Sequence, residues 1–328
     1  MPPPWTDAIV SAGAVPAAFV PEASGGRSDL AEVVGAELVE DGELQVHPVS
    51  AQGAPSPASV SFLDGIQRWG VVGYDGVTPI VRAYVAAAVR RRARDRRLRT
   101  AHEAAREFAV TRLAGLRDSV RRALAGAGVD VVDLAEAEAG QPGRVLEASR
   151  REVEAARVAL EKELGERCAT GLRADEWLVV DGVLSESALL AAHPRALGVI
   201  KSHGAQYFEG PALERALTVS AAHRTSVFRP RGRARHEVYS WYLRLWPWEG
   251  NDLLYGLLRI EARAHPDTVA GATDVSAWLL AERAPLATPD ARWDRLLYPI
   301  YDVESYLKAR APRDLLPTPG SRLPRTGT

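Results

Sequence analysis

Short apolar runs separated by turn residues open the patterned part of the chain. The runs at 59–65, 69–74 and 78–85 are rich in Val, Ile, Phe, Trp and Tyr, and Asp75-Gly76 separates the second from the third. A glycine, Gly65, also closes the first run. Apolar and β-branched runs bounded by turn residues are typical of strands joined by hairpins. The pattern predicts a three-stranded antiparallel meander.

Two later segments have compositions typical of helices. Residues 99–124 and 145–168 are rich in Ala, Leu, Arg and Glu, and apolar residues recur at helical spacing in the second of them. Two short and almost wholly apolar runs follow at 177–182 and 197–201, as expected of strands that are covered on both faces. A meander, then helices, then buried strands predicts a mixed α/β fold.

The two ends of the chain differ in composition from the part between them. Residues 1–57 are rich in Pro, Gly, Ala and Ser with short apolar patches, which predicts an N-terminal arm or appended strands. Residues 314–328 have the composition of a disordered tail. We therefore expect one folded domain at 58–313, preceded by the arm and followed by a C-terminal extension.

Composition and charge exclude some classes of protein. The chain of 328 residues is 46% hydrophobic and 25% charged, without an apolar run near 18 residues, so we expect a globular protein that does not cross a membrane. A net charge of -1 argues neither for nor against a nucleic-acid ligand. The single cysteine, Cys168, excludes an intramolecular disulfide and a multi-cysteine zinc site, and no basic-then-apolar leader is visible. These features predict a cytoplasmic protein.

Two aspartates stand at similar places in the pattern. Asp64 and Asp181 each end an apolar run and each precede a glycine. If their strands lie side by side and parallel, a strand spacing of about 4.8 Å brings the carboxylates close enough to share a divalent ion. Such a pair repels itself unless a cation compensates it, which is why these pairs bind Mg²⁺ or Mn²⁺ for phosphoryl chemistry. Asp-Gly is also a common turn pair, and for each aspartate alone the turn interpretation stays open.

The order of these elements resembles that of ribonuclease H-like nucleases, which carry one aspartate on the first strand of a meander and another on a later strand. More specifically, the chain resembles the NurA family of DNA-end nucleases. The resemblance rests on Phe62-Leu63-Asp64-Gly65, on the stretch 178–184 with its Asp181-Gly182, on 198–203, and on the C-terminal stretch 290–304. Each motif is short, and their order and spacing carry the likeness over roughly residues 58–310.

The resemblance implies a fold and a function. The expected fold is a ribonuclease H-like mixed sheet flanked by helices. The expected function is a Mn²⁺- or Mg²⁺-dependent deoxyribonuclease that acts on DNA ends in end processing or anti-phage defence. The family also implies a homodimer that works with a hexameric HerA-type DNA-translocating ATPase. Cleavage polarity, strand preference and the choice between repair and defence stay open.

The family pattern requires a glutamate on the helix before the second aspartate strand. Glu154 and Glu161 are seven residues apart, so both lie on one helical face, about 10.5 Å apart along the axis. Glu161 is nearer the strand and is the expected third metal ligand beside Asp64 and Asp181, although the choice between the two glutamates stays open. A surface ion pair between Arg157 and Glu161 at i,i+4 is the competing interpretation.

Further positions both match the family and depart from it. Lys201 is expected to meet a phosphate or the leaving-group charge, although a lysine at a strand end is also commonly just solvated. Tyr298 fits the C-terminal tyrosine of the family, but the histidine that often follows eight residues later is Tyr306. Ile66 and Val183 replace the serine that often follows Asp-Gly. These departures favour the alternative, a catalytically silent DNA-binding or scaffold subunit of the same kind of assembly.

Arginines cluster locally although the total charge is balanced. Twelve of them lie between Arg90 and Arg122 against four acidic residues, but a solvated helix face explains this run nearly as well as DNA contact does. A second cluster consists of Arg224, Arg229, Arg231, Arg233 and Arg235, of which Arg231, Arg233 and Arg235 are candidate DNA-phosphate contacts. The chain has no Gly-x-x-x-x-Gly-Lys phosphate loop, so an ATP-dependent activity requires a partner.

Overall fold

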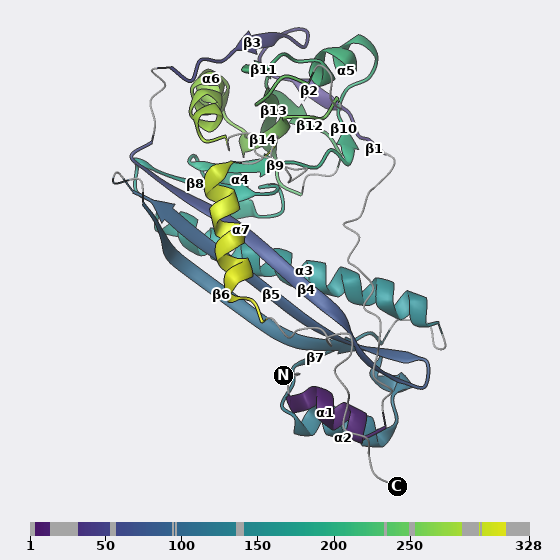
Figure 1. Ribbon diagram of the computed structural model, residues 1–328. Helices are drawn as coiled ribbons and strands as arrows, with labels where there is room; N and C mark the ends of the chain where they lie inside the picture. The colour runs from purple at the N-terminus through teal and green to yellow at the C-terminus, as the bar shows by residue number, and fades with distance from the viewer. Residues whose placement is uncertain are drawn as a thin grey trace.

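The long central strands organise the molecule (Figure 1). The computed structural model describes residues 4–13, 32–52, 57–93, 95, 97–135, 141–232, 235–248, 253–283, 295 and 297–312. The expected tail at 314–328 lies outside the described residues. Within them, one mixed sheet of twelve strands and a separate pair form the β structure, and helices cover both faces of the large sheet. The chain is therefore α/β with a large mixed sheet, as the pattern predicts.

A long antiparallel meander forms the first half of this sheet. The expected strands at 59–65 and 69–74 are one continuous strand, because Gly65 stays in the ladder opposite Ala87 and does not form a turn. The chain reverses at Asp75-Gly76, where Gly76 takes the left-handed φ of 58° that favours glycine. The strands are β4 (Ser59–Asp75), β5 (Thr78–Arg92) and β6 (Leu98–Thr111).

The prediction of a helix at 99–124 is wrong for most of this segment. Residues 98–111 form β6, which pairs with β5 from Val81 to Arg92, and a helix begins only at α2 (Asp118–Gly126). Ala, Arg and Glu favour a helix in isolation, but the ladder offered by a long hairpin partner overrides that weak local preference. A short turn of 3-10 helix (Leu113–Gly115) and the strand β7 (Val131–Asp133) lie on either side of α2. The expected helix at 145–168 is confirmed as α3 (Pro142–Thr170).

The second half of the sheet begins with two parallel strands. β8 (Glu176–Asp181) lies parallel to the start of β4, and β9 (Ala196–Ile200) lies parallel to β8, which confirms the two buried strands. The order is therefore β6–β5–β4–β8–β9. The antiparallel strands β14 (Leu257–Arg263) and β13 (Val238–Arg244) continue the sheet beyond β9.

The far edge of the sheet is built from short segments. Residues of the N-terminal region add strands there, in agreement with the expectation of appended strands: β2 pairs with β12 and β3 pairs with β11. The remaining elements are β2 (Ala36–Leu38), β3 (Val46–Pro48), β11 (His223–Thr225), β12 (Phe228–Pro230), the pair β1 (Glu32–Val33) and β10 (Ala205–Gln206), α4 (Ala188–Ala192) and α5 (Gly210–Leu217).

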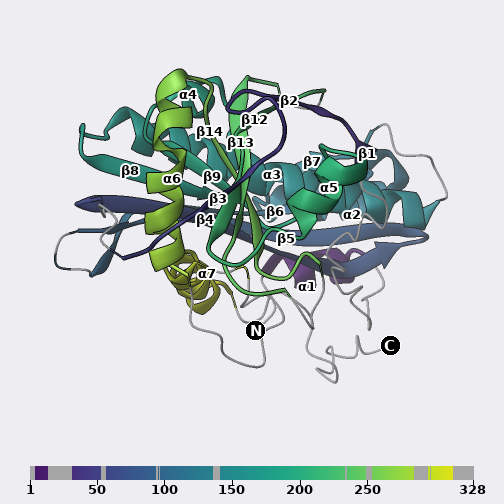
Figure 2. The same ribbon diagram turned by 90° about the horizontal axis from the view of Figure 1, so that it is seen from above.

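Three helices cover the faces of the sheet and define its core. α3 and α7 (Tyr298–Arg310) lie on opposite sides of the long strands (Figure 2). Leu63 and its neighbours pack on the α3 side, whereas Phe62 and Ile66 belong to the cluster that contains Ile300 and Val303 of α7. α6 (Pro266–Ala281) extends that second cluster over β13 and β14. Strand positions on β4 therefore alternate between the two helices.

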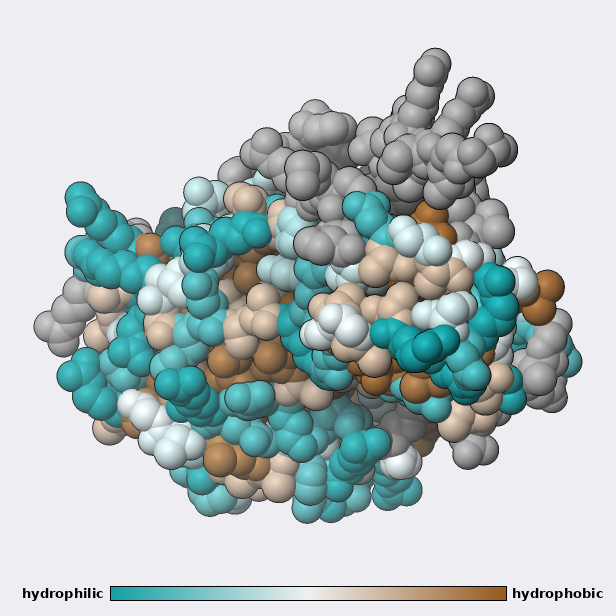
Figure 3. Space-filling view, turned by 90° about the horizontal axis from the view of Figure 1, so that it is seen from below, coloured by the Kyte–Doolittle hydropathy of each residue, from teal (hydrophilic) through white to brown (hydrophobic). Residues whose placement is uncertain are grey.

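The tip of the β4–β5 hairpin carries a small separate cluster. α1 (Pro4–Ser11) and α2 pack together there around Trp5, Ile9 and Val120. Hydrophilic side chains cover much of the face seen from below, with smaller hydrophobic patches between them (Figure 3). Among the helices of the described residues, none combines the length and the apolar character that a membrane crossing requires.

Candidate metal centre

The two aspartates lie beside each other on neighbouring parallel strands. Leu63 of β4 pairs with Val180 of β8, so Asp64 and Asp181 both follow one paired rung. Asp181 ends β8 as expected, but Asp64 does not end its strand, because β4 continues to Asp75. Asp64 is buried, with 7% of its surface exposed, whereas Asp181 is half-buried. The parallel arrangement on which the sequence-based prediction depended is confirmed.

A tightly constrained loop follows Asp181. The Gly182 N–H donates to the Val199 carbonyl at 3.0 Å, and Gly182 has a φ of 143° that other residues rarely adopt. Gly198 is equally constrained, because a Cβ there would stand 2.6 Å from the Gly182 carbonyl oxygen. Glycines at both positions let β9 and the loop approach closely and hold the carboxylate of Asp181 at the end of its strand.

A buried ion pair on β14 supports the same loop. Glu261 accepts hydrogen bonds from the backbone N–H groups of Leu184 at 2.8 Å and Ser185 at 3.3 Å, and Arg259 pairs with it at 2.7 Å. Both charged residues are buried, so replacing either partner would leave an uncompensated charge. The sequence pattern did not indicate this pair, because Arg and Glu two positions apart on a strand usually lie on its solvent-exposed face.

Glu161, and not Glu154, reaches the aspartate strand. Its carboxylate occupies the space that a Cβ of Gly65 would fill, and only 9% of the residue is exposed. Glu154, on the same helix, is exposed. The ion pair of the competing interpretation also forms, between Arg157 and Glu161, but it is largely buried rather than at the surface, and Arg157 Nε donates to the Gln67 side chain at 3.2 Å. Glu161 is thus both paired and placed at the site.

Negative charge accumulates at this point. Burial and the neighbouring charge of Asp181 raise the pKa of Asp64 well above its usual range, with Glu161 adding to the effect and Lys201 opposing it. Burial also raises the pKa of Glu161, although Arg157 opposes the shift. Lys201 Nζ lies 2.8 Å from Asp181 Oδ2. The three carboxylates of Asp64, Asp181 and Glu161 together attract a cation in addition to Lys201 and Arg157.

An open cavity of about 500 Å³ is lined by Asp64, Asp181 and Lys201, whereas Glu161 is not part of the lining and meets it only through its close contact with Gly65. Besides Asp64, Asp181 and Lys201 the cavity is lined by residues for which the sequence predicted no role at the metal site, namely Arg157, Ser202, Arg295 and Glu304. Glu304 comes from α7, next to the buried Val303. The apolar spacing of Ile300, Val303 and Leu307 would have placed Glu304 at the border of the buried face of α7.

The donor set fits a hard divalent cation. Carboxylate oxygens are the ligands that Mg²⁺ and Mn²⁺ prefer, and several converge on this cavity. They do not yet form a closed cage: among the described residues, only Glu40, Asp41 and His47 bring three such ligand atoms within 4.8 Å of one another. Asp181 and Glu161 are each paired with a basic side chain instead.

The tighter group at Glu40, Asp41 and His47 is bound by other side chains. Arg224 holds both oxygens of Glu40 at 2.7 Å, and Ser226 donates to Asp41 at 2.6 Å. These bonds attach the segment between β2 and β3 to β11 and the residues that follow it. The group therefore has a structural explanation that requires no ion.

The two tyrosines lie outside the cavity. Tyr298 is exposed at the start of α7, where its backbone N–H donates to the Glu282 carbonyl at 2.9 Å. Tyr306 lies under the guanidinium of Arg90, 4.7 Å from the ring centroid, and its hydroxyl bonds Glu103. Tyr306 thus packs α7 onto β5 and β6, and neither tyrosine lines the cavity with Asp64.

The arginine clusters are largely paired. In the second cluster Arg231 pairs with Glu37 at 3.6 Å and Arg235 with Glu186 at 3.2 Å, while Arg233 lies outside the described residues. The adjoining His236 N–H donates to the Ser185 carbonyl at 3.1 Å, so this segment borders the loop after Asp181.

The first part of the first cluster lies on β5 and β6 rather than on the expected helix face, and only its last members, Arg121 and Arg122, lie on α2. Arg90 pairs with Asp302 of α7 at 2.8 Å, and Arg92 pairs with Glu282 after α6. These two arginines attach the C-terminal helices to the sheet. Arg94 and Arg96 lie outside the described residues.

The chain matches none of the protein-family models and none of the curated proteins with which it was compared. The site itself is therefore the basis for its function.

Proposed function

We propose that this protein is a Mn²⁺- or Mg²⁺-dependent deoxyribonuclease of the NurA kind, with a ribonuclease H-like core. One observation carries the proposal: buried Asp64 lies beside Asp181 on the adjacent parallel strand, and Glu161 closes on them at Gly65. Three carboxylates at the end of a parallel strand pair favour a divalent metal more than any other ligand.

The strand order supports the ribonuclease H-like assignment. The antiparallel meander β6–β5–β4 continues into β8 and β9, both parallel to β4, and the helix that carries Glu161 precedes β8 in the chain. This agrees with the element order that the resemblance implies. The additional strands beyond β9 would then be an extension of the core.

Each side chain has a distinct role in this proposal. A bound metal supplies an activated water and stabilises the charge of the leaving oxygen. Asp64 and Asp181 hold the ion from adjacent strands, and Arg157 orients Glu161 toward them. Lys201 presents its ammonium at the same cavity, where it would meet a phosphate of the DNA backbone.

The partners are also part of the proposal. Without a phosphate loop of its own, the protein would depend on a hexameric HerA-type ATPase to move duplex DNA toward the site, and it would act as a homodimer. Arg235 borders the loop after Asp181 through Glu186, and Arg235 and Arg231 would contact DNA phosphates after exchanging their acidic partners.

A silent DNA-binding or scaffold subunit is the alternative, and specific observations favour it. Ile66 is buried in the core under α7, so it offers the site no hydroxyl group. Lys201 and Arg157 already neutralise Asp181 and Glu161, as they would in a protein that never loads a metal. Tyr306 is engaged with Glu103 and offers no ligand.

A nuclease assay distinguishes the two proposals. Internally labelled linear duplex and internally labelled covalently closed circular DNA are incubated with the protein in Mn²⁺, with EDTA and the variant Asp64→Asn as controls. The nuclease proposal predicts that the label is released from linear DNA only, and that EDTA and Asp64→Asn both abolish release. DNA binding without any cleavage in Mn²⁺ or Mg²⁺ would favour the scaffold.

A further inference from the structure

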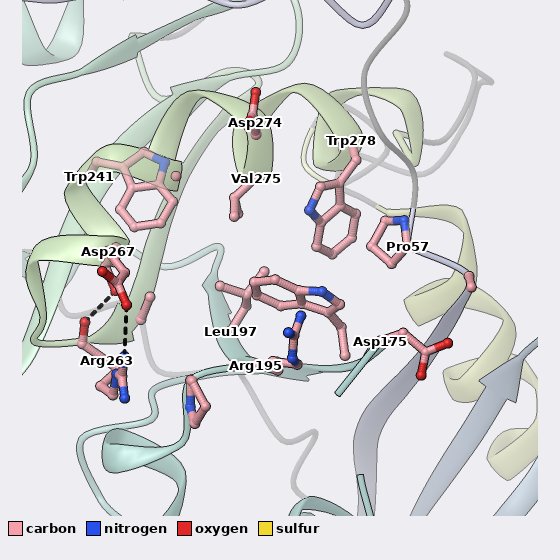
Figure 4. A pocket seen from close by; sticks show the side chains of 16 residues that line it. Pro57, Asp175, Arg195, Leu197, Trp241, Arg263, Asp267, Asp274, Val275 and Trp278 are labelled. Atoms are coloured by element: carbon pink, nitrogen blue, oxygen red, sulfur yellow. Dashed lines mark hydrogen bonds and ion pairs between the residues drawn. The ribbon is translucent and has the colours of Figure 1, made fainter. Parts of the chain in front are cut away.

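A second cavity lies at the opposite end of the parallel strands. It has a volume of about 570 Å³ and lies between α6 and the sheet, near the starts of β8 and β9 (Figure 4). Trp177, the second residue of β8, lines it, whereas Asp181 ends the same strand at the candidate metal centre. A volume between about 300 and 1,000 Å³ is typical of small-molecule sites. The two cavities are therefore separate sites.

Aromatic side chains form the walls of this cavity. Three of the eight tryptophans of the chain line it: Trp177, Trp241 and Trp278. The rings of Trp177 and Trp278 meet edge to face with centroids 5.9 Å apart, and Trp241 satisfies its indole N–H by donating to Ser276 Oγ at 2.9 Å. Trp241 and Trp278 lie on opposite sides of the space, with Val275 between them (Figure 4). Trp241 and Trp278 are buried and form the base of the wall, whereas the half-buried Trp177 presents an accessible ring on which a planar ligand can stack.

One positive charge that enters the cavity has no acidic partner among the described residues. The Arg195 guanidinium lies 5.8 Å from the ring centroid of Trp177 and points into the space (Figure 4). In the part of the chain that the structure describes, no carboxylate lies within ion-pair distance of it. Arg263, the other arginine of the lining, pairs with Asp267 at 3.6 Å. A half-buried guanidinium beside an aromatic wall suits a phosphate or a carboxylate.

Acidic side chains stand at the rim. Asp175 and Asp274 line the opening and are exposed, so they can accept hydrogen bonds from hydroxyl or amino groups of a ligand. A planar ring, an anionic group and several hydrogen-bond donors occur together in a nucleotide. We propose that this cavity binds a nucleoside monophosphate, with the base against Trp177, the phosphate at Arg195, and the sugar or base donors at the rim carboxylates.

Calorimetric titration with AMP, adenosine and inorganic phosphate tests the site. The titrations contain EDTA, so that phosphate binding to a metal at Asp64 and Asp181 does not contribute. We expect AMP to bind about tenfold or more tightly than adenosine, because the phosphate adds charge-assisted hydrogen bonds, and phosphate alone to bind weakest. If AMP does not bind, or if AMP and adenosine bind equally, the proposal is wrong.

Two variants locate the binding. Arg195→Met is expected to remove the preference for AMP over adenosine, whereas the matched variant Arg263→Met keeps it, because Arg263 is already neutralised by Asp267. Trp177→Leu is expected to weaken both ligands by a similar factor. Arg195 and Trp177 are only half-buried, and circular dichroism confirms that the variants are folded. Unchanged AMP affinity in Arg195→Met would overturn the assignment.

A free nucleotide and the terminal nucleotide of a strand share this chemistry. A 5′-phosphorylated trinucleotide provides the comparison: equal affinity with AMP indicates a strand-end site, and much weaker binding indicates a site for the free nucleotide. The result does not depend on cleavage, so it stands apart from the outcome of the nuclease assay.

Discussion

Asp64 and Asp181 follow a single paired rung, Leu63 with Val180, on two parallel strands that are far apart in the sequence. β8 ends at Asp181, whereas β4 continues beyond Asp64. Both carboxylates line the open cavity at this point. Because Asp64 on β4 is buried, the repulsion between the two carboxylates is unfavourable unless a cation compensates it. This relationship is the basis of the predictions that follow.

Asp64→Asn is expected to stabilise the metal-free protein. The substitution keeps the shape of the side chain but removes one of several buried like charges, whose uncompensated burial is unfavourable. A gain of about 1 kcal/mol corresponds to about 2 °C in a chain of this size. Thermal unfolding in EDTA measures the effect, with the exposed Glu154→Gln as the control variant. A lower melting temperature for Asp64→Asn would contradict the electrostatic account.

Glu161→Gln and Glu154→Gln are expected to differ sharply. Glu161 lies against Gly65, whereas Glu154 is exposed on the same helix, so only the first substitution should abolish nuclease activity. The paired assay on linear DNA in Mn²⁺ measures both. The reverse result would move the third ligand to Glu154, and two active variants would argue for a site without α3.

Gly65→Ala tests the close approach of α3. The backbone of Gly65 lies outside the left-handed region, so alanine is tolerated there, but its Cβ would overlap the Glu161 carboxylate. We expect Mn²⁺ affinity to fall about tenfold, with partial recovery in Gly65→Ala combined with Glu161→Asp, whose shorter side chain leaves room. Gly42→Ala is the matched control, since a Cβ at Gly42 meets nothing. Equal affinity for both alanine variants would show that Glu161 does not take part.

Several features could be predicted from the sequence, for local reasons. The apolar runs at β8 and β9 are almost wholly buried, so their composition alone identifies them as interior parallel strands. The stripe on α3 indicated that Glu161 lies at the edge of the buried face, and Glu161 is buried, because helical spacing carries positional information. By contrast, β6 has a helical composition and became a strand only because β5 provides a ladder for it.

The missing site residues were hidden for a different reason. Glu304, Arg157 and the pair Arg259 and Glu261 act through contacts between elements distant in the sequence, and no motif marks such contacts. Charged residues at these spacings are common on solvated faces. Only the fold shows that Glu261 is buried and holds the loop after Asp181.

His203 is expected to make the stability of the protein depend on pH. Burial lowers the pKa of His203 to about 4, so the folded state holds the ring neutral. The unfolded state takes up a proton first, and the contribution present above pH 6.5 is lost as the pH falls toward 4. Between pH 7 and pH 5 the loss is about 2 kcal/mol. Urea unfolding at both pH values should show a smaller loss for His203→Gln, and an identical loss would contradict the prediction.

Binding of Mn²⁺ to the purified protein tests the central claim most directly, because it requires neither DNA nor a partner. Electron paramagnetic resonance of free Mn²⁺ follows the titration of the wild type, Asp64→Asn, Asp181→Asn and Asp41→Asn. We predict binding to the wild type and to Asp41→Asn, and a loss of about tenfold or more in affinity for both Asp64→Asn and Asp181→Asn. Wild-type affinity in the Asp64 and Asp181 variants, or its loss in Asp41→Asn alone, would contradict the account and move the metal to the group at Glu40, Asp41 and His47.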